Sequence, residues 1–229
     1  MDPLSPTPRT TIGRGRDRAV REREQLHALL ADALVAHLGV LAGEHPHEHP
    51  VVLPVAFGVE AAGPDAGGTL YLHGSVAAGW LARALEHDVC LSVTELDGLV
   101  AGRSSFHHSM NYRSAVVIGR ARLVTELAER ERALELVVDH MIPGRWRTLR
   151  ASTRKELAAT AVLALGLAEA SMKQRAGGPG DEAGDIAAGV WGGHIPVRRT
   201  AGEPVPDPDA TGPVPADVVR RARQLGAPG

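Results

Sequence analysis

Two long strand-like segments on either side of a short polar insert constrain the fold more than any other feature of this chain. Residues 89–100 alternate apolar and polar side chains, and residues 112–124 contain the β-branched run Val116-Val117-Ile118. The insert between them, residues 106–111, is polar and aromatic. The pattern predicts two long β-strands joined by a polar connection.

Shorter strands and flanking helices are predicted in the rest of the chain. Apolar and β-branched stretches predict strands at 34–41, 51–59 and 69–73. Residues 161–170 are apolar and fit either a buried helix or a closing strand, of which we favour the strand. Helical spacing predicts helices at 22–33, 76–86, 126–141, 153–158 and 216–224.

The order of these elements favours an antiparallel β fold. Five or six strands follow one another at meander spacing, without the regular strand–helix alternation of a doubly wound sheet. No GxGxxG motif follows a predicted strand, and the sequence contains no P-loop. We therefore expect a mainly β protein with flanking helices, built as a closed or split antiparallel barrel.

Length and charge limit the domain organisation and the partners. The 229 residues suffice for one domain with loose ends, which we place as a disordered leader (1–21), the domain (22–200) and a Pro-rich tail (201–229). With 25 Lys and Arg against 27 Asp and Glu, there is no basic field to attract nucleic acid. Aromatic residues make up 3%, which also argues against a base-stacking surface.

The single cysteine and the lack of long apolar segments predict a soluble cytoplasmic protein. Cys90 cannot form an intramolecular disulfide, and we expect it to be a small buried strand residue. Residues 1–22 lack the apolar centre of a secretory signal. The longest charge-free apolar stretch, 157–168, is too short to cross a membrane.

Four stretches of the sequence resemble the pyridoxamine 5'-phosphate oxidase-like family, in the branch that includes nitroimidazole-resistance-type flavin proteins. The most specific contains Arg103-Ser-Ser-Phe-His-His-Ser-Met-Asn-Tyr-Arg-Ser114, which is too long and too polar to arise from amphipathic patterning. The four stretches are residues 32–39, 70–75, 93–114 and 191–207. The resemblance implies a six-stranded split barrel that forms a homodimer and holds flavin mononucleotide (FMN) between its protomers.

The first candidate site lies where a predicted strand meets a predicted helix, at His73-Gly74-Ser75. A hydroxyl, a glycine and the N–H groups of a helix start together suit an anion. Ser75 could instead simply cap the helix. The resemblance favours contact with the flavin phosphate.

The second candidate site is the polar segment from Arg103 to Arg113. Such a cluster is costly to bury without a ligand or a hydrogen-bond network, although it could also form a solvated hairpin loop. The resemblance makes most of its side chains cofactor-binding candidates, and we include Thr94 on the preceding strand rather than Glu95. These candidates are Thr94, Arg103, His107, His108, Ser109, Asn111, Tyr112 and Arg113.

The chain departs from the family at the expected phosphate clamp. Relatives commonly read Ser-x-x-Ser-Arg after the strand, whereas this chain has Ala78-Gly79 at the matching pair. A charge-assisted Arg–phosphate bond is therefore missing. Arg83, one helical turn further on, is a possible substitute.

The resemblance implies an FMN-dependent oxidoreductase acting on a small organic substrate, such as a nitro compound or a quinone. Two alternatives stay open: a flavin- or haem-binding protein without turnover, and a deazaflavin-dependent reductase. The missing Ser-Arg clamp slightly favours both alternatives over the FMN-dependent enzyme. We assign no catalytic acid or base and no metal site, because the loop histidines His45, His47 and His49 lack a second ligand cluster.

Overall fold

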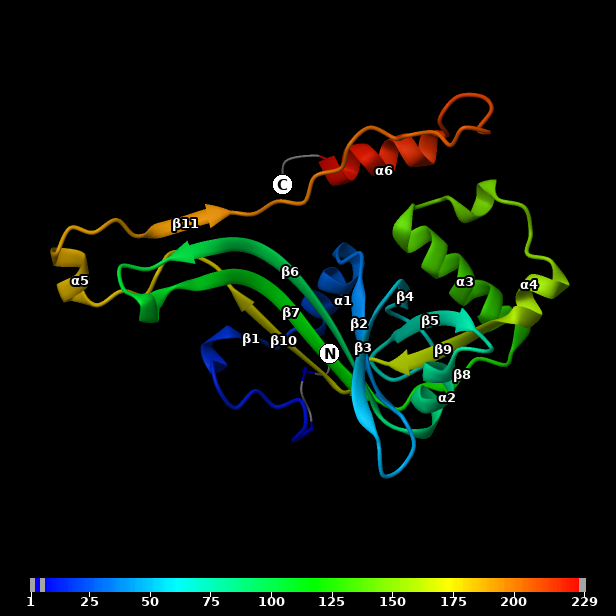
Figure 1. Ribbon diagram of the computed structural model, residues 1–229, viewed down its shortest axis with the longest axis horizontal. Helices are drawn as coiled ribbons and strands as arrows, with labels where there is room; N and C mark the ends of the chain where they lie inside the picture. The colour runs from blue at the N-terminus through cyan, green and yellow to red at the C-terminus, as the bar shows by residue number, and fades with distance from the viewer. Residues whose placement is uncertain (1–2, 5–6, 227–229) are drawn as a thin grey trace.

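The computed structural model describes residues 3–4 and 7–226, which form two antiparallel β-sheets (Figure 1). The larger sheet has seven strands, in the order β1-β10-β7-β6-β2-β3, and β11 pairs with β6 beyond the end of β2. The smaller sheet has four strands, in the order β4-β5-β9-β8.

The elements have the following bounds. The strands of the larger sheet are β1 Ala19–Val20, β2 Ala36–Ala42, β3 His49–Val55, β6 Val89–Ala101, β7 Ser109–Gly119, β10 Ala170–Arg175 and β11 Gly193–Pro196. The strands of the smaller sheet are β4 Phe57–Glu60, β5 Thr69–Ser75, β8 Arg122–Leu123 and β9 Thr160–Gly166. The α-helices are α1 Arg23–Asp32, α2 Gly79–Glu86, α3 Leu127–Met141, α4 Arg154–Ala159, α5 Ala183–Ala187 and α6 Ala216–Gly226. Short 3-10 helices are η1 Arg16–Arg18, η2 Ser105–His107 and η3 Trp146–Thr148.

The hydrophobic core unites the two sheets and α1. Leu38 and Leu91 from the larger sheet join Leu72 and Leu163 from the smaller one, and Leu29 of α1 packs with them. Burying a side chain of this size stabilises the fold by about 1.5–3 kcal/mol. The alternation of buried and exposed residues along β2 and β6 follows from having one face on this core.

Helix α3 covers the other face of the smaller sheet, so its central strands are buried on both faces. Tyr71, Ala133 and Val162 form a second apolar cluster there. Gly58 permits the close approach of α3, because a Cβ at this position would lie 2.7 Å from backbone atoms of Leu136 and Val137. Burial on both faces explains the uninterrupted apolar run of β9 and confirms a strand, rather than a helix, in this segment.

The β6–β7 hairpin extends beyond the core as a long arm. β6 has 13 residues and β7 has 11, and Asp97 forms a bulge where the hairpin leaves the body. We define the arm as residues 97–110 together with residues 177–196, which include α5 and β11. Figure 1 shows it projecting to the left of the body.

The chain returns from the arm to the body as a tail that ends in α6 (Figure 1). Arg221 of α6 donates hydrogen bonds to the carbonyl oxygens of Met141 and His140, at 2.8 and 3.2 Å. Arg220 donates to the carbonyl oxygen of Pro143. These donors satisfy carbonyl groups at the C-terminal end of α3.

The described part of the predicted leader makes specific contacts. Arg9 pairs with Asp88 and Glu169, Leu4 is buried, and β1 pairs with β10. This differs from the disorder predicted there, because the partners lie far away in the sequence and leave no local pattern. The division of the chain into leader, domain and tail stays a prediction.

The predicted fold class, an antiparallel β fold with flanking helices, is confirmed, whereas the strand arrangement differs from six strands. The segment predicted as one strand at 51–59 divides at Ala56, where the chain passes from the larger sheet to the smaller one. The helix predicted from residue 76 begins at Gly79. Ser109 to Asn111, predicted as part of the insert, belong to β7.

Two matched glycine substitutions test the packing of α3. We expect Gly58→Ala to lower the free energy of unfolding by about 1–3 kcal/mol, since the added methyl meets backbone atoms that cannot move aside. Gly79→Ala, whose methyl meets nothing within 4 Å, should be neutral or stabilise by up to about 1 kcal/mol. Urea denaturation of the cofactor-free protein, followed by circular dichroism, measures both. Equal midpoints would contradict the close approach.

Candidate cofactor site

The β5–α2 connection carries the first predicted site. Ser75 Oγ accepts a hydrogen bond from the Ala77 N–H at 3.2 Å, and α2 starts only at Gly79, with Ala78 as its N-cap. Ser75 is therefore a turn residue and not the helix cap. Gly74 makes room for the Trp80 indole, because a Cβ there would lie 2.7 Å from Trp80 Cζ2.

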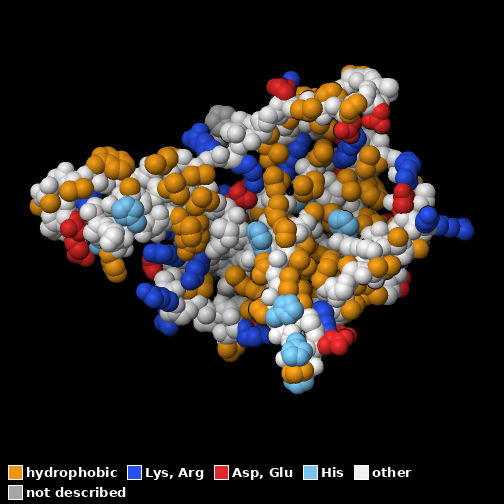
Figure 2. Space-filling view, in the orientation of Figure 1, with side chains coloured by type: hydrophobic (Ala, Val, Ile, Leu, Met, Phe, Trp, Pro, Cys, Tyr) orange, Lys and Arg blue, Asp and Glu red, His pale blue; other side chains and the backbone are white. Residues whose placement is uncertain are grey.

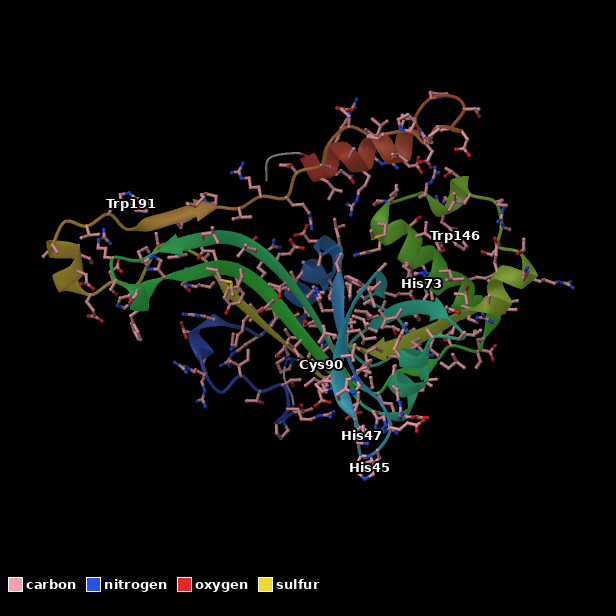
Figure 3. All side chains as sticks on the ribbon, viewed as in Figure 1. His45, His47, His73, Cys90, Trp146 and Trp191 are labelled. Carbon is pink, nitrogen blue, oxygen red and sulfur yellow. The ribbon has the colours of Figure 1, made fainter. Side chains whose placement is uncertain are left out.

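His73 lies on β5, and its surroundings favour a neutral imidazole. The surrounding protein lowers its pKa below the usual value through desolvation. A neutral imidazole offers one N–H donor and one lone pair, which suits hydrogen bonding to a cofactor. Figure 3 shows His73 on the side of the molecule opposite the arm.

The start of α2 has open space where relatives carry the clamp arginine. An ideal Cβ at Gly79 meets no atom within 4 Å. Arg83, the possible substitute, donates to the carbonyl oxygen of Gly43 and to Glu86 at 3.3 Å. Its guanidinium is therefore already engaged within the protein.

Thr94 is exposed on the outer face of the larger sheet, where it pairs with Ser114. Glu95 points the other way and binds Arg199. Cys90 lies on the same face as Thr94 and is exposed, which corrects the prediction of a buried cysteine. Partial burial raises the pKa of its thiol, so Cys90 is not an activated nucleophile.

Two of the predicted cofactor-binding residues bind other parts of the chain. Arg103 donates to the carboxylate of Asp181 at 2.7 Å and to the carbonyl oxygen of Val190 at 2.8 Å. Buried Asn111 donates to the carbonyl oxygen of Gly177 at 3.1 Å. Arg103 and Asn111 thus hold residues 177–190 against the hairpin.

The remaining arm candidates differ in how far they are available to a ligand. His107 packs edge-on against Phe106, with ring centroids 5.2 Å apart. His108 is exposed, and its Nδ1 lies 3.0 Å from the Ser104 carbonyl oxygen. Ser109 is exposed at the start of β7, while Tyr112 is half-buried beside Leu96.

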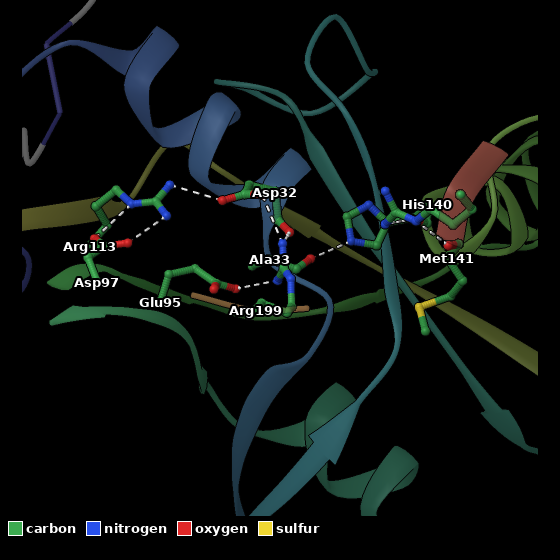
Figure 4. Close-up of polar contacts among 9 residues, drawn as sticks. Asp32, Ala33, Glu95, Asp97, Arg113, His140, Met141 and Arg199 are labelled. Atoms are coloured by element: carbon green, nitrogen blue, oxygen red, sulfur yellow. Dashed lines mark hydrogen bonds and ion pairs between the residues drawn. The ribbon is translucent and has the colours of Figure 1, made fainter. Parts of the chain in front are cut away.

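Arg113 belongs to an ion network at the base of the arm (Figure 4). It forms a bidentate pair with Asp97, with both distances 3.0 Å, and a third bond to Asp32 at 3.0 Å. Arg199 bridges Asp32 and Glu95, also at 3.0 Å. The hydrogen bonds that Arg113 donates to Asp97 raise the pKa of Arg113 despite its partial burial. The sequence showed neither Asp32 nor Arg199 as part of this site, because their partners lie far apart along the chain.

The arm exposes many large apolar side chains. Leu99 pairs with Met110 on one side and with Ile195 on the other, and all three are exposed. At the outer end, Phe106 is 88% and Trp191 69% exposed. Figures 2 and 3 show apolar side chains over the arm and Trp191 near its end.

The two halves of the predicted site do not meet within one chain. Ser75 ends β5 in the body, whereas residues 105–108 form the turn at the end of the arm. These elements lie at opposite sides of the molecule in Figure 1. The predicted cofactor-binding residues therefore form one group in the body and another on the arm.

Among residues 3–4 and 7–226, no three or more His, Cys, Asp or Glu side chains gather in a metal-binding group. Within the same ranges, no helix has both the length and the apolar character needed to cross a membrane.

Known proteins resemble this chain along most of its length. The flavocytochrome Anf3 from Azotobacter vinelandii is 37% identical, with 95% of this chain and 98% of that chain aligned and a TM-score of 0.86. The FAD and haem binding protein from Mycobacterium smegmatis is 38% identical, with coverages of 91% and 97% and a TM-score of 0.80. A putative 5-nitroimidazole antibiotic resistance protein from Bacteroides thetaiotaomicron shares the fold at 18% identity, with coverages of 68% and 85% and a TM-score of 0.54.

No match was found among curated proteins. The sequence profile described as pyridoxamine 5'-phosphate oxidase matches residues 22–174, which is more than half of the chain. Together with the two relatives above 35% identity, this match confirms the resemblance seen in the sequence. The chain belongs to the pyridoxamine 5'-phosphate oxidase family.

Proposed function

We propose that this protein is a redox protein that binds FAD and haem between two copies of the chain. The observation that carries the proposal is the extent of similarity to two proteins described as a flavocytochrome and as an FAD and haem binding protein. The aligned shares, 95% and 91%, extend well beyond the family match at 22–174. The likeness thus includes much of the arm and the tail as well as the family domain.

The start of α2 supports FAD rather than the FMN predicted from the resemblance. FMN ends in a phosphomonoester with about two negative charges, like other phosphate monoesters near neutral pH, and a guanidinium is the residue of choice for such a group. The diphosphate of FAD instead continues into the adenosine part and needs space. Gly79 leaves that space open, and Arg83 is engaged elsewhere.

The cofactors supply the electron-transfer chemistry, and the protein binds and orients them. In the body, the turn at Ser75 and the start of α2 would hold the flavin phosphates. Exposed Thr94 would face the flavin ring from the outer sheet surface. An electron transfer involving a small organic substrate fits this arrangement. Flavin or haem binding without turnover and a deazaflavin in place of FAD stay as alternatives, and the cytoplasmic location stays a prediction.

A homodimer would complete the site and cover the arm. Phe106 and Trp191 alone present about 300 Å² of exposed ring surface, taking roughly 150–250 Å² per aromatic side chain. Contiguous apolar patches larger than a few hundred Å² usually mark an interface. In a two-fold dimer, the arm of each chain can reach the body of its partner. The dimer would then contain two complete sites, each made from the body of one chain and the arm of the other.

Charge placed on the arm tests the dimer. Leu99, Met110 and Ile195 form a row of exposed apolar side chains across the arm, which we call the apolar row. We expect Ile195→Glu to weaken dimerisation by about ten- to thirtyfold, since it buries an unpaired carboxylate in this row. Val205→Glu is the matched control, because Val205 is 91% exposed but lies in the tail. Sedimentation over a concentration series measures both. A monomeric wild type, or equal effects of the two variants, would contradict the proposed interface.

Restoring the family clamp tests the choice of flavin. The double variant Ala78→Ser with Gly79→Arg should bind FMN about ten- to a hundredfold more tightly than wild type, the effect of one good charge-assisted contact. Its affinity for FAD should not rise, because the new side chain occupies space used by the diphosphate. Flavin fluorescence titration of the apoprotein gives both constants, with Gly79→Ala as control. A wild type that prefers FMN would overturn the assignment to FAD, and binding of a deazaflavin alone would favour the deazaflavin alternative.

A further inference from the structure

We propose that His108 ligates the haem iron through its Nε2 atom. This inference rests on the proposed function, since it assigns a ligand to a haem that the comparisons suggest. His108 lies at the outer end of the arm, immediately after η2 and before β7.

The hydrogen bond of His108 fixes the tautomer that a metal requires. Its Nδ1 lies 3.0 Å from the Ser104 carbonyl oxygen, and a carbonyl oxygen can only accept. In the neutral imidazole, Nδ1 therefore carries the proton and Nε2 has the lone pair. Metal-ligating histidines commonly donate their second ring N–H to a backbone carbonyl in this way, which orients the ring and raises the basicity of the ligand atom. The His108 side chain is exposed, so Nε2 is accessible.

The surroundings of His108 suit an apolar macrocycle. Phe106 is two residues away, and Arg103 donates to the carbonyl oxygen of Val190, which directly precedes exposed Trp191. A Cβ at Gly192 would lie 2.6 Å from the Arg103 guanidinium, which shows how closely this segment packs against the turn. Figure 2 shows histidine beside apolar side chains on the arm. Such aromatic surface is costly to leave in water and offers stacking area to a porphyrin.

Three of the other histidines fit less well. His27 and His140 place Nε2, rather than Nδ1, against a carbonyl oxygen, and His140 also packs on Phe57. His107 packs against Phe106 and interacts electrostatically with Asp181, whose carboxylate already binds Arg103.

Within the described chain, His49 alone shares the Nδ1–carbonyl arrangement of His108. Its partner is the His47 carbonyl oxygen, at 3.1 Å. His49 lies in the exposed β2–β3 hairpin, and Figure 3 shows His45 and His47 at its turn. Among the large apolar side chains of β2 and β3, only Val52 is exposed. It is therefore a matched control that has the same hydrogen bond without the apolar setting.

The test titrates full-length apoprotein with ferric haem b and follows the Soret band. Wild type should show a sharpened, shifted Soret band at one haem per chain. His108→Ala should bind haem at least tenfold more weakly or show an altered Soret position, whereas His49→Ala should match wild type. In His108→Gly, added imidazole should restore the wild-type spectrum, which a merely structural role would not allow.

The outcomes separate the two proposals. A wild type that does not bind haem would overturn the proposed function. Haem binding with an unchanged spectrum in His108→Ala would overturn the ligand assignment alone. Loss of the Soret shift in His73→Ala or His194→Ala, with His108→Ala unaffected, would also overturn it and would move the ligand to that residue. Circular dichroism of His108→Ala checks that the variant is folded.

Discussion

Asp32, the last residue of α1, accepts hydrogen bonds from two arginines that belong to different parts of the chain. Arg113 comes from the hairpin and Arg199 from the tail, and both lie 3.0 Å from the Asp32 carboxylate. Asp97 adds a bidentate pair with Arg113, and its carbonyl oxygen accepts from the Val197 N–H. Partly exposed ion pairs contribute little stability, about 0–1 kcal/mol each, whereas the apolar core contributes far more. The network therefore contributes mainly to orientation, because it sets the direction in which the arm extends from the body.

In the proposed arrangement, the direction of the arm decides where a cofactor can bind. The bulge at Asp97 lies where β2 no longer pairs with β6 and β11 takes its place. From there the hairpin continues without a core beneath it, and its apolar row faces outwards. A single chain thus holds the body group and the arm group apart. In the proposed dimer, one contact between the two chains covers the exposed apolar row and also brings the body group of one chain to the arm group of the other.

The sequence predicted the elements whose side chains alternate or are uniformly apolar. β6 followed from alternation, and β2 and β9 followed from runs of apolar residues. Elements fixed by distant partners could not be predicted. The exchange between sheets at Ala56 leaves no local signal, and the pairing of Arg9 with Glu169 joins residues 160 positions apart.

For the candidate site, the motif named the segments, whereas the contacts that each residue makes within the chain became visible only in the structure. Arg103 and Asn111 were cofactor candidates because of their polarity, yet Arg103 binds Asp181, and Asn111 binds Arg175 and the carbonyl oxygen of Gly177. The absence of the family's Ser-Arg pair at Ala78-Gly79 was visible in the sequence, whereas the open space beside Gly79 was visible only in the structure. Polarity predicts that a segment has partners, and three-dimensional geometry decides which partners they are.

Complementation between two defective chains tests most directly that each cofactor site combines the body of one chain with the arm of the other. One chain would carry Gly79→Trp, which fills the space at the start of α2, and the other would have residues 104–108 replaced by Asn-Gly, a two-residue hairpin turn. Each variant alone should lose its cofactors. A heterodimer purified through two different tags should retain about half of the wild-type cofactor content, because one of its two sites combines an intact body with an intact arm. A heterodimer as empty as its parents, although folded and dimeric, would contradict a site shared between chains.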